Sequence, residues 1–358
     1  CLPLVSGAGE ARAAARHAAM VVDANTGEVL ADQSANEPRY PASLTKIMTL
    51  YLVFELIEQG KLSYATRIRI SEEAAAQPPS KLGLAAGSEI TVGDAVRAVV
   101  TRSANDMAVA LAEHIAGSEE GVAERMTTRA RQLGMAATTF RNASGLPDSG
   151  QMTTSSDMIK LALRIQDEFP RHYRVFSTRV FVFGGHMHRN HNTMLGTFAG
   201  MDGIKTGYTS ASGFNLLASV RRDGKHVVAV VFGGQSAAAR NARMHVLLTR
   251  GLTRASKTKT REPALAHATT APSPGRRPLP RPAPSAAAVA PPAARPMLVE
   301  GVAPVAVGVP AAPKSAPPAA RSPFTVTRVR TVDVAAVDGT PPPGGADVEV
   351  KRVGPVSL

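Results

Sequence analysis

Proline is distributed very unevenly along this chain of 358 residues, and that limits how much of it can form a packed domain. Of the 27 prolines, 20 lie after residue 254. The same segment holds few large apolar side chains, with runs such as AVAPPAARP at 288–296. Such a composition cannot bury enough surface to offset chain entropy. We therefore expect a folded domain over residues 17–254 and a largely disordered, Pro/Ala-rich basic tail over 255–358.

The net charge of +13 is shared between the two parts, about +6 for residues 1–254 and +7 for the tail. A basic chain can bind nucleic acid. However, the sequence has no basic stripe studded with aromatic residues and no zinc-ligand spacing, so no nucleic-acid partner is expected. Attraction of the tail to the cell wall or to a membrane surface is one alternative, and a solvated tail without a partner is the other.

The first 16 residues predict export. Residues 2–13 are small and apolar and end in Ala11-Arg12-Ala13, which resembles a signal-peptidase site. We expect residues 1–16 to be an export-signal remnant or leader, and the protein to be periplasmic or associated with the cell envelope. A lipidated Cys1 is the alternative. Because Cys1 is the only cysteine, no internal disulfide can form. No apolar run approaches the roughly 18 residues of a membrane span.

The first 254 residues alternate between strand-like and helix-like patterns. Apolar residues around Asn25-Thr26-Gly27 predict two strands, and residues 213–220 and 226–233 predict a hairpin. Strands lie near both ends of this region, with helices between and after them. This order predicts an α+β fold in which the terminal strands share one antiparallel sheet flanked by helices. The expected helices span 44–59, 92–116, 118–133, 157–167 and 237–252.

The segment 44–59 is the strongest helix signal, and its apolar residues on nearly all faces indicate a buried helix. Ser43 and Lys46 lie at its start, three residues apart, so their side chains share one face. Free N–H groups at a helix start suit an oxyanion on a carbonyl attacked by Ser43. Burial lowers the pKa of an ammonium, so Lys46 is expected to act as base. The alternative is a chance Ser-x-x-Lys match, like the one at 256–259.

A second candidate string, Ser103-Ala104-Asn105, interrupts the helical pattern of 92–116. Such a break can direct a hydroxyl and an amide into a cleft. There Ser103 would relay a proton between Lys46 and a leaving amine, and Asn105 would bind a substrate amide. The alternative is an ordinary helix N-cap, which these residue types favour in any protein.

A third candidate string, Lys205-Thr206-Gly207, lies just before the predicted hairpin. Gly207 allows a backbone or ligand to approach closely. Lys205 would attract a carboxylate and lower the pKa of Lys46 further. The alternative is an exposed lysine in a turn.

In this order, the three strings are similar to the motif set of penicillin-binding proteins and class A β-lactamases. From about residue 17 to 252 the chain resembles the low-molecular-mass penicillin-binding proteins, the serine D-Ala-D-Ala carboxypeptidases of peptidase family S11. The resemblance extends to four longer strings, YPASLTK at 40–46, NASGL at 142–146, NHN at 190–192 and DGIKTGYT at 202–209.

The resemblance implies a serine β-lactamase/DD-peptidase-like fold with an all-helical subdomain. It implies that Ser43 is acylated by the penultimate D-Ala carbonyl of a peptidoglycan stem peptide, with Lys46 as base. Water then releases the shortened peptide. β-Lactam antibiotics are the expected covalent inhibitors.

The resemblance also implies roles for the remaining site residues. The backbone N–H groups of Ser43 and Tyr208 would form the oxyanion hole. Thr206 and an arginine of the closing helix, best matched by Arg240, would hold the terminal carboxylate. The expected catalytic residues are Ser43, Lys46, Ser103 and Asn105, and the expected substrate-binding residues are Lys205, Thr206, Gly207, Tyr208 and Arg240.

Three other functions are compatible with parts of this pattern. A D,D-endopeptidase shares the acyl chemistry and differs in its leaving group. A β-lactamase needs a deacylating glutamate between the second and third motifs, where only Glu168 is a candidate. A non-catalytic wall-binding protein is expected to lack Ser43 or Lys46, and both are present. The better-known family members carry a β-rich second domain and an amphipathic C-terminal anchor where this chain has its tail, so anchoring stays open.

A metal site is a further alternative, because His186, His188 and His191 lie close together and two can share a strand face. No carboxylate pair or cysteine lies nearby in the sequence. No metal or other cofactor is therefore expected.

Overall fold

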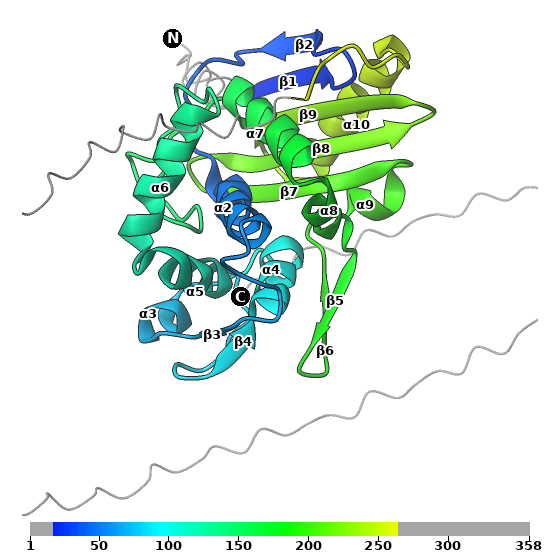
Figure 1. Cartoon of the computed structure of the whole chain (residues 1–358). Coiled ribbons are helices and arrows are strands. Elements are labelled where there is room, and N and C mark those ends of the chain that lie inside the picture. Colours follow the sequence, from blue (N-terminus) through cyan, green and yellow to red (C-terminus); the bar gives the residue numbers. More distant parts are fainter. Residues whose placement is uncertain (1–16, 264–358) are drawn as a thin grey trace, which may run out of the picture. The chain divides into compact units, whose positions relative to one another are not determined.

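The centre of the fold is a five-stranded antiparallel sheet with the strand order β2-β1-β9-β8-β7 (Figure 1). The structure is a computed structural model, and it describes residues 17–263. Because β1 pairs with β9, the predicted sharing of one sheet by the terminal strands is confirmed. The strands are β1 (Ala18–Asp23), β2 (Val29–Gln33), β7 (Met201–Thr209), β8 (Gly213–Arg222) and β9 (Lys225–Gly234).

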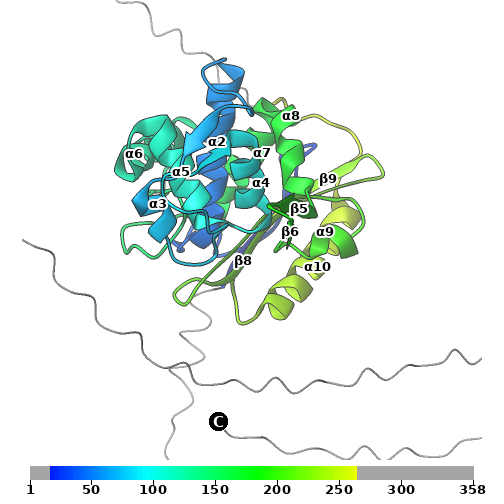
Figure 2. The same cartoon turned by 90° about the horizontal axis from the view of Figure 1, so that it is seen from below.

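Alternate residues of the sheet supply two separate cores. Along β9, Val228, Val230 and Phe232 join the larger core on one face. Val227, Ala229 and Val231 join a smaller core with α10 (Ala237–Arg254) on the other face. This period of two places one helix layer on each side of the sheet (Figure 2). The predicted α+β architecture with flanking helices is therefore confirmed.

The larger core belongs mainly to a helical part of the molecule built around α2 (Lys46–Glu58), which is buried from Lys46 through Phe54. The helical pattern predicted over 92–116, with its break at Ser103-Ala104-Asn105, is confirmed as two helices separated by a short break. The other helices of this part are α3 (Glu72–Ala76), α4 (Val92–Thr101), α5 (Asn105–Ala116), α6 (Glu119–Gln132) and α7 (Ser155–Glu168).

Short elements complete the described chain. The family resemblance implied an all-helical subdomain. The helical part also holds a two-stranded sheet, in which β3 (Arg67–Arg69) pairs with β4 (Glu89–Thr91). A second pair joins β5 (Val180–Phe183) to β6 (His186–Arg189). The remaining short helices are η1 (Ala42–Thr45), α8 (Pro170–Tyr173), η2 (Arg174–Ser177) and α9 (Met194–Thr197).

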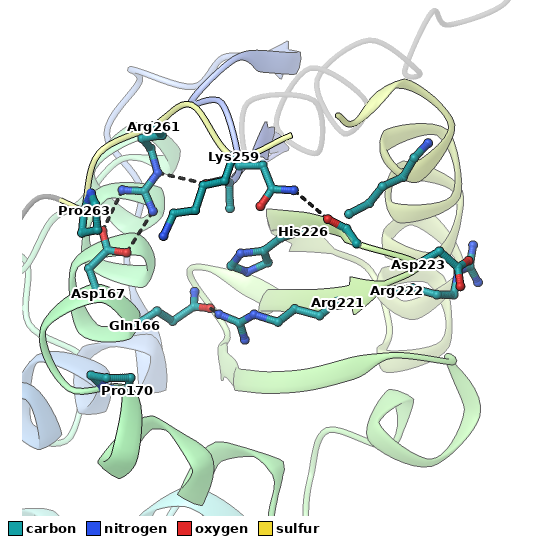
Figure 3. Close-up of a pocket in the computed structure, with 14 residues that line it drawn as sticks. Gln166, Asp167, Pro170, Arg221, Arg222, Asp223, His226, Lys259, Arg261 and Pro263 are labelled. Atoms are coloured by element: carbon teal, nitrogen blue, oxygen red, sulfur yellow. Dashed lines mark hydrogen bonds and ion pairs between the residues drawn. The ribbon is translucent and has the colours of Figure 1, made fainter. Parts of the chain in front are cut away.

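Residues 255–263, which we call the strap, pack onto the domain although the sequence analysis assigned them to the tail. The backbone N–H of Ser256 donates to Asp23, and the N–H of Arg261 donates to the carbonyl of Asn25. The Arg261 guanidinium forms a bidentate ion pair with Asp167 of α7, at 2.7 and 3.0 Å (Figure 3). The predicted domain end at 254 is therefore corrected, because the contacts of the domain continue through the strap. These contacts are polar, so the pattern of apolar residues in the sequence does not indicate them.

The remaining predictions for the ends of the chain, an export signal at 1–16 and disorder in the tail beyond 263, lie outside the described residues. Within residues 17–263 no helix combines the length and the apolar character needed to cross a membrane.

Replacing Arg261 tests the strap. Arg261→Ala should lower the free energy of unfolding by about 3 kcal/mol, because it removes an ion pair whose carboxylate is only 8% exposed. Denaturant unfolding measures this loss. The control is Arg222→Ala, whose side chain is 43% exposed and lies 3.8 Å from Asp223. It should change stability by less than about 0.5 kcal/mol. Equal losses in the two variants would contradict the role assigned to the strap.

Candidate active site

Ser43 lies in η1, the short turn that leads directly into α2, as the sequence predicts. Its Oγ is 3.2 Å from the Nζ of Lys46. A serine hydroxyl within hydrogen-bond reach of a lysine amine is the arrangement needed to activate the serine as a nucleophile. The structure thus places a candidate nucleophile beside a candidate base.

Lys46 is completely buried, and three oxygens surround its Nζ. The amine contacts Ser43 Oγ, Asn105 Oδ1 at 2.7 Å and the carbonyl of Ser144. Burial lowers the pKa of Lys46 well below its usual value, and the charge of Lys205 lowers it further. Both effects were predicted from the sequence. They favour the neutral amine, which is the form that accepts a proton.

The string Ser103-Ala104-Asn105 forms the break between α4 and α5, but it does not cap the helix by its side chains. The N-cap residue is Ala104, and no side-chain hydrogen bond caps α5. Asn105 instead bridges Lys46 and the carbonyl of Pro78. Ser103 adopts a left-handed backbone with φ of 59°, and its buried Oγ has no hydrogen-bond partner among the described residues. The helix-cap interpretation is therefore wrong.

Lys205, Thr206 and Gly207 lie within β7, the edge strand of the large sheet, and not in a turn. The Lys205 side chain is only 2% exposed, and its Nζ donates to the carbonyl of Thr206 at 3.0 Å. Burial lowers the pKa of Lys205 to about 7, with a further contribution from the charge of Arg240. The exposed-turn alternative is therefore wrong.

Tyr208 and Arg240 also reach this site. Tyr208 is 55% exposed, and its ring packs on Phe214 with the centroids 4.3 Å apart. Arg240, in α10, is 4% exposed and donates to the carbonyl of Asn215. Burial lowers its pKa to about 10, so the guanidinium stays charged at neutral pH.

Two glycines allow β7 and the 142–146 loop to contact the nucleophile's backbone. A Cβ built on Gly207 would lie 3.1 Å from the backbone nitrogen of Ser43. A Cβ on Gly145, whose φ is +81°, would lie 1.9 Å from the carbonyl oxygen of Ala42. The close approach predicted at Gly207 is thus confirmed, and its partner is the backbone of Ser43.

These elements enclose a cleft of about 360 Å³, which we call the central cleft. The predicted site residues that line it are Ser43, Ser103, Asn105, Thr206, Gly207, Tyr208 and Arg240. Lys46 and Lys205 are buried beneath it. A larger cavity of about 620 Å³ lies beside the strap, and none of the predicted site residues lines it (Figure 3). The structure therefore brings all the predicted site residues together in one place.

Residue-level reasoning from the sequence missed eight lining residues of the central cleft, and three of them, Gly145, Leu146 and His191, are considered next. Burial lowers the pKa of His191 to about 4, and the nearby Lys205 adds to this effect, so the imidazole is neutral. All three lie in strings that carry the family resemblance. That resemblance was the only signal able to find them.

The two alternatives that depend on other side chains lose their structural basis. Glu168 accepts hydrogen bonds from Tyr51, at 2.6 Å, and from Arg164, and it does not line the central cleft. It is therefore not placed to activate a deacylating water. His186 and His188 lie on β6, away from the cleft lining, and residues 17–263 contain no group of three potential metal-ligating side chains.

Comparison with known proteins agrees with this geometry. A family model for D-alanyl-D-alanine carboxypeptidases, peptidase S11, matches residues 6–236. The D-alanyl-D-alanine carboxypeptidase DacF of Bacillus subtilis is 33% identical over 239 residues, which cover 64% of this chain and 60% of DacF. The structure is similar to penicillin-binding protein 5 from Haemophilus influenzae, with a TM-score of 0.64 and 33% identity over 66% of this chain and 70% of that one.

Penicillin-binding protein D2 from Listeria monocytogenes, solved in its cefotaxime-bound form, is similar too. Its TM-score is 0.60 at 30% identity, and the match covers 66% of this chain and 96% of that one. The fold is thus that of the penicillin-binding proteins. The chain belongs to the D-alanyl-D-alanine carboxypeptidase family, peptidase S11. It spans about 60% of the length of the curated relatives it matches.

Substitution of Gly145 tests the close approach at the nucleophile. Gly145→Ala should lower the free energy of unfolding by at least about 2 kcal/mol, because the new Cβ meets the Ala42 carbonyl and the residue has a left-handed backbone. Thermal or denaturant unfolding measures the change. Gly196→Ala is the matched control, because a Cβ there meets nothing within 4 Å. The packing argument is wrong if both variants keep the stability of the parent protein.

Proposed function

We propose that this protein is a serine D-Ala-D-Ala carboxypeptidase that removes the terminal D-Ala from peptidoglycan stem peptides. The observation that carries the proposal is the contact of Ser43 Oγ with the fully buried amine of Lys46, at 3.2 Å. Burial and the charge of Lys205 lower the pKa of that amine, which favours its neutral form. A neutral amine beside a serine is a base in place for acyl transfer.

In the acylation step, Ser43 Oγ attacks the carbonyl carbon of the penultimate D-Ala while Lys46 takes the hydroxyl proton. The oxyanion lies between the backbone N–H groups of Ser43 and Tyr208. The bond to the terminal D-Ala nitrogen breaks, and Ser103, whose buried Oγ has no partner among residues 17–263, passes the Lys46 proton to that nitrogen. An ester on Ser43 and free D-Ala result.

In the deacylation step, Lys46 takes a proton from water, and the resulting hydroxide attacks the ester carbonyl. The shortened peptide leaves, and Ser43 regains its proton. Asn105 holds the Lys46 amine and binds the substrate amide. Neutral His191 adds no competing charge to the cleft.

Recognition of the terminal carboxylate falls to the cationic end of the central cleft. Thr206 and Arg240 line that end, and buried Lys205 lies beneath it. A guanidinium and a hydroxyl are suitable donors for a carboxylate. β-Lactams carry a carboxylate next to a reactive amide, so they are the expected covalent inhibitors. The cefotaxime-bound form of the Listeria relative supports this.

A cell-wall substrate requires the protein to be exported, and we include export in the proposal. Its sequence basis is the signal-like residues 1–16. The folded catalytic domain is proposed to extend from about residue 17 through the strap.

Labelling with penicillin tests the acyl-enzyme. Intact mass spectrometry after incubation with a fluorescent penicillin should show one adduct, which proteolysis maps to Ser43. Ser43→Ala should show none. Rapid penicillin hydrolysis without an adduct would favour a β-lactamase, and no reaction with either protein would contradict the proposal.

The leaving group needs a separate assay. A carboxypeptidase releases D-Ala from a pentapeptide at least about tenfold faster than it cleaves a cross-linked dimer, because only the pentapeptide presents a terminal carboxylate at the cationic end. The opposite ratio would make the protein a D,D-endopeptidase with the same acyl chemistry.

The pH dependence follows from Lys205. Its pKa lies near 7, so its charge is present below that pH and lost above it. We expect kcat/KM to fall as pH rises above about 7, because the free enzyme loses the cation that attracts the carboxylate. A bound carboxylate raises the pKa of Lys205, so kcat should fall only at higher pH. The control is a peptide with an amidated C-terminus, for which kcat/KM should not fall in this way above pH 7. A kcat/KM independent of pH between about 6 and 9 would contradict the role of Lys205.

A further inference from the structure

The cavity beside the strap, which we call the strap cavity, is a candidate for a second binding site. It has a volume of about 620 Å³, and its walls come mainly from the strap, the end of α7 and the turn between β8 and β9 (Figure 3). It shares no lining residue with the central cleft. The proposed carboxypeptidase reaction therefore leaves the strap cavity without a function.

Positive charge predominates in the strap cavity. Five of its lining residues are lysine or arginine, and two are aspartate. Two of the five cations have partners elsewhere, because Arg222 lies 3.8 Å from Asp223 at the exposed turn, and Lys225 donates to a carbonyl at the end of α10. The other three belong to β8 and the strap, and they are the cations that can face a bound ligand: Arg221, Lys259 and Arg261.

Both arginines are held in position by neighbouring side chains and still keep donors for a ligand. The bidentate ion pair with Asp167 orients Arg261. Arg221 donates to Gln166 at 2.7 Å and pairs with Asp202. A guanidinium has five N–H groups, and these contacts use only some of them. The two side chains therefore combine a fixed position with remaining N–H donors.

Lys259 differs from the arginines because its ammonium forms no hydrogen bond or ion pair within residues 17–263. Its side chain extends from the strap into the cavity (Figure 3). Burial lowers the pKa of His226, another lining residue, to about 3, and the charges of Arg221, Arg261 and Lys259 contribute to this effect. The three cations therefore converge on one part of the cavity, where the imidazole is neutral at pH 7.

An anion whose oxygens point in several directions matches this arrangement. The donors belong to three separate side chains, so they approach a ligand from different directions. A phosphate group is tetrahedral and carries up to two negative charges, whereas a carboxylate is planar and carries one. Arginine and lysine both bind phosphate. A volume of about 620 Å³ is in the usual range of small-molecule sites, so an organic group attached to the phosphate has room as well.

We propose that the strap cavity binds a phosphate-bearing ligand, whose phosphate is held by Lys259, Arg221 and Arg261. Soluble phosphate esters and phospholipid headgroups both carry this group, and both meet the same three cations. Because the strap supplies two of these cations, a bound phosphate also fastens the strap to the domain. The site is separate from the central cleft, so it does not depend on the proposed reaction.

Titration with glycerol 3-phosphate tests the site in the full-length protein. Calorimetry at low salt and neutral pH should show saturable binding with a Kd below about 1 mM. Lys259→Gln should weaken binding by at least about fivefold, because it removes the cation that no carboxylate neutralises. It should leave penicillin acylation and D-Ala release unchanged, since Lys259 does not line the central cleft. No saturable binding below about 10 mM would overturn the proposal.

Lys257→Gln is the matched control for this titration. It removes the same charge from another exposed position of the strap, but Lys257 does not line the cavity. Its Kd should stay within about twofold of that of the parent protein. Equal weakening in the two lysine variants would mean that the basic surface attracts the anion without a defined site, and the proposal would be rejected.

Histidine signals in NMR spectra show where the phosphate binds, which matters because the central cleft is cationic too. In protein labelled with ¹³C-histidine, glycerol 3-phosphate should shift the imidazole signal of His226 in the strap cavity. It should leave the signal of His191 in the central cleft unchanged. A shift of His191 alone would place the anion in the central cleft and overturn the assignment to the strap cavity.

Two further probes define the ligand. Acetate at the same concentration should not shift the His226 signal, and an equal shift with acetate would refute the preference for phosphate. Sedimentation with phosphatidylglycerol vesicles, compared with phosphatidylcholine vesicles, distinguishes the sources of phosphate. Binding to phosphatidylglycerol that Lys259→Gln weakens and Lys257→Gln does not would support the proposal with a lipid headgroup as the ligand. Binding of glycerol 3-phosphate without vesicle binding would support it with a soluble phosphate ester.

Discussion

The burial of the Lys46 amine is the constraint on which the geometry of the active site depends. A charged ammonium in that position would be strongly unfavourable, and even a neutral amine needs hydrogen-bond partners. Its partners come from three separate segments: Ser43 from η1, Asn105 from the start of α5, and the carbonyl of Ser144 from the loop before α7. Displacing any of them removes one of the hydrogen bonds that offset the burial of the amine. The contacts that stabilise the buried lysine therefore also hold the nucleophile beside its base.

The site lies where the helical part meets the edge of the sheet, and small residues make that junction possible. Gly145 of the 142–146 loop approaches the backbone around Ser43 to a distance that excludes a Cβ, and Gly207 of β7 approaches it to a distance at which a Cβ would be tight. β7 has a partner strand on only one side. Its free edge can therefore accept an extended peptide, in the manner of strand addition. In the proposed function, catalysis and substrate binding thus use the same strand edge.

The sequence allowed much of this arrangement to be predicted, and the misses have identifiable physical causes. Ser43 and Lys46 were predictable because their spacing and the buried helix are local properties. The sequence left two interpretations of Ser103 and Asn105 open, because an N-cap and an active-site amide require the same residue types. The direct contact of Asn105 with Lys46 decided between them. The exposed turn stayed open as an alternative for Lys205, because an edge strand buried by a neighbouring segment lacks an alternating pattern. The strap was missed because hydrogen bonds and an ion pair hold it, and these leave no periodic signal.

The sequence alone determined the chemistry and the fold class, because nucleophile and base lie within one helical turn and the strand and helix periods are encoded residue by residue. The tertiary structure decided which distant groups join them. The contacts of Lys46 with Asn105 and Ser144, the lowered pKa of Lys205, and the close approach of Gly145 all arise from segments far apart in the chain. Long-range distances have no local sequence signature, so the shape of the central cleft became visible only in the folded protein.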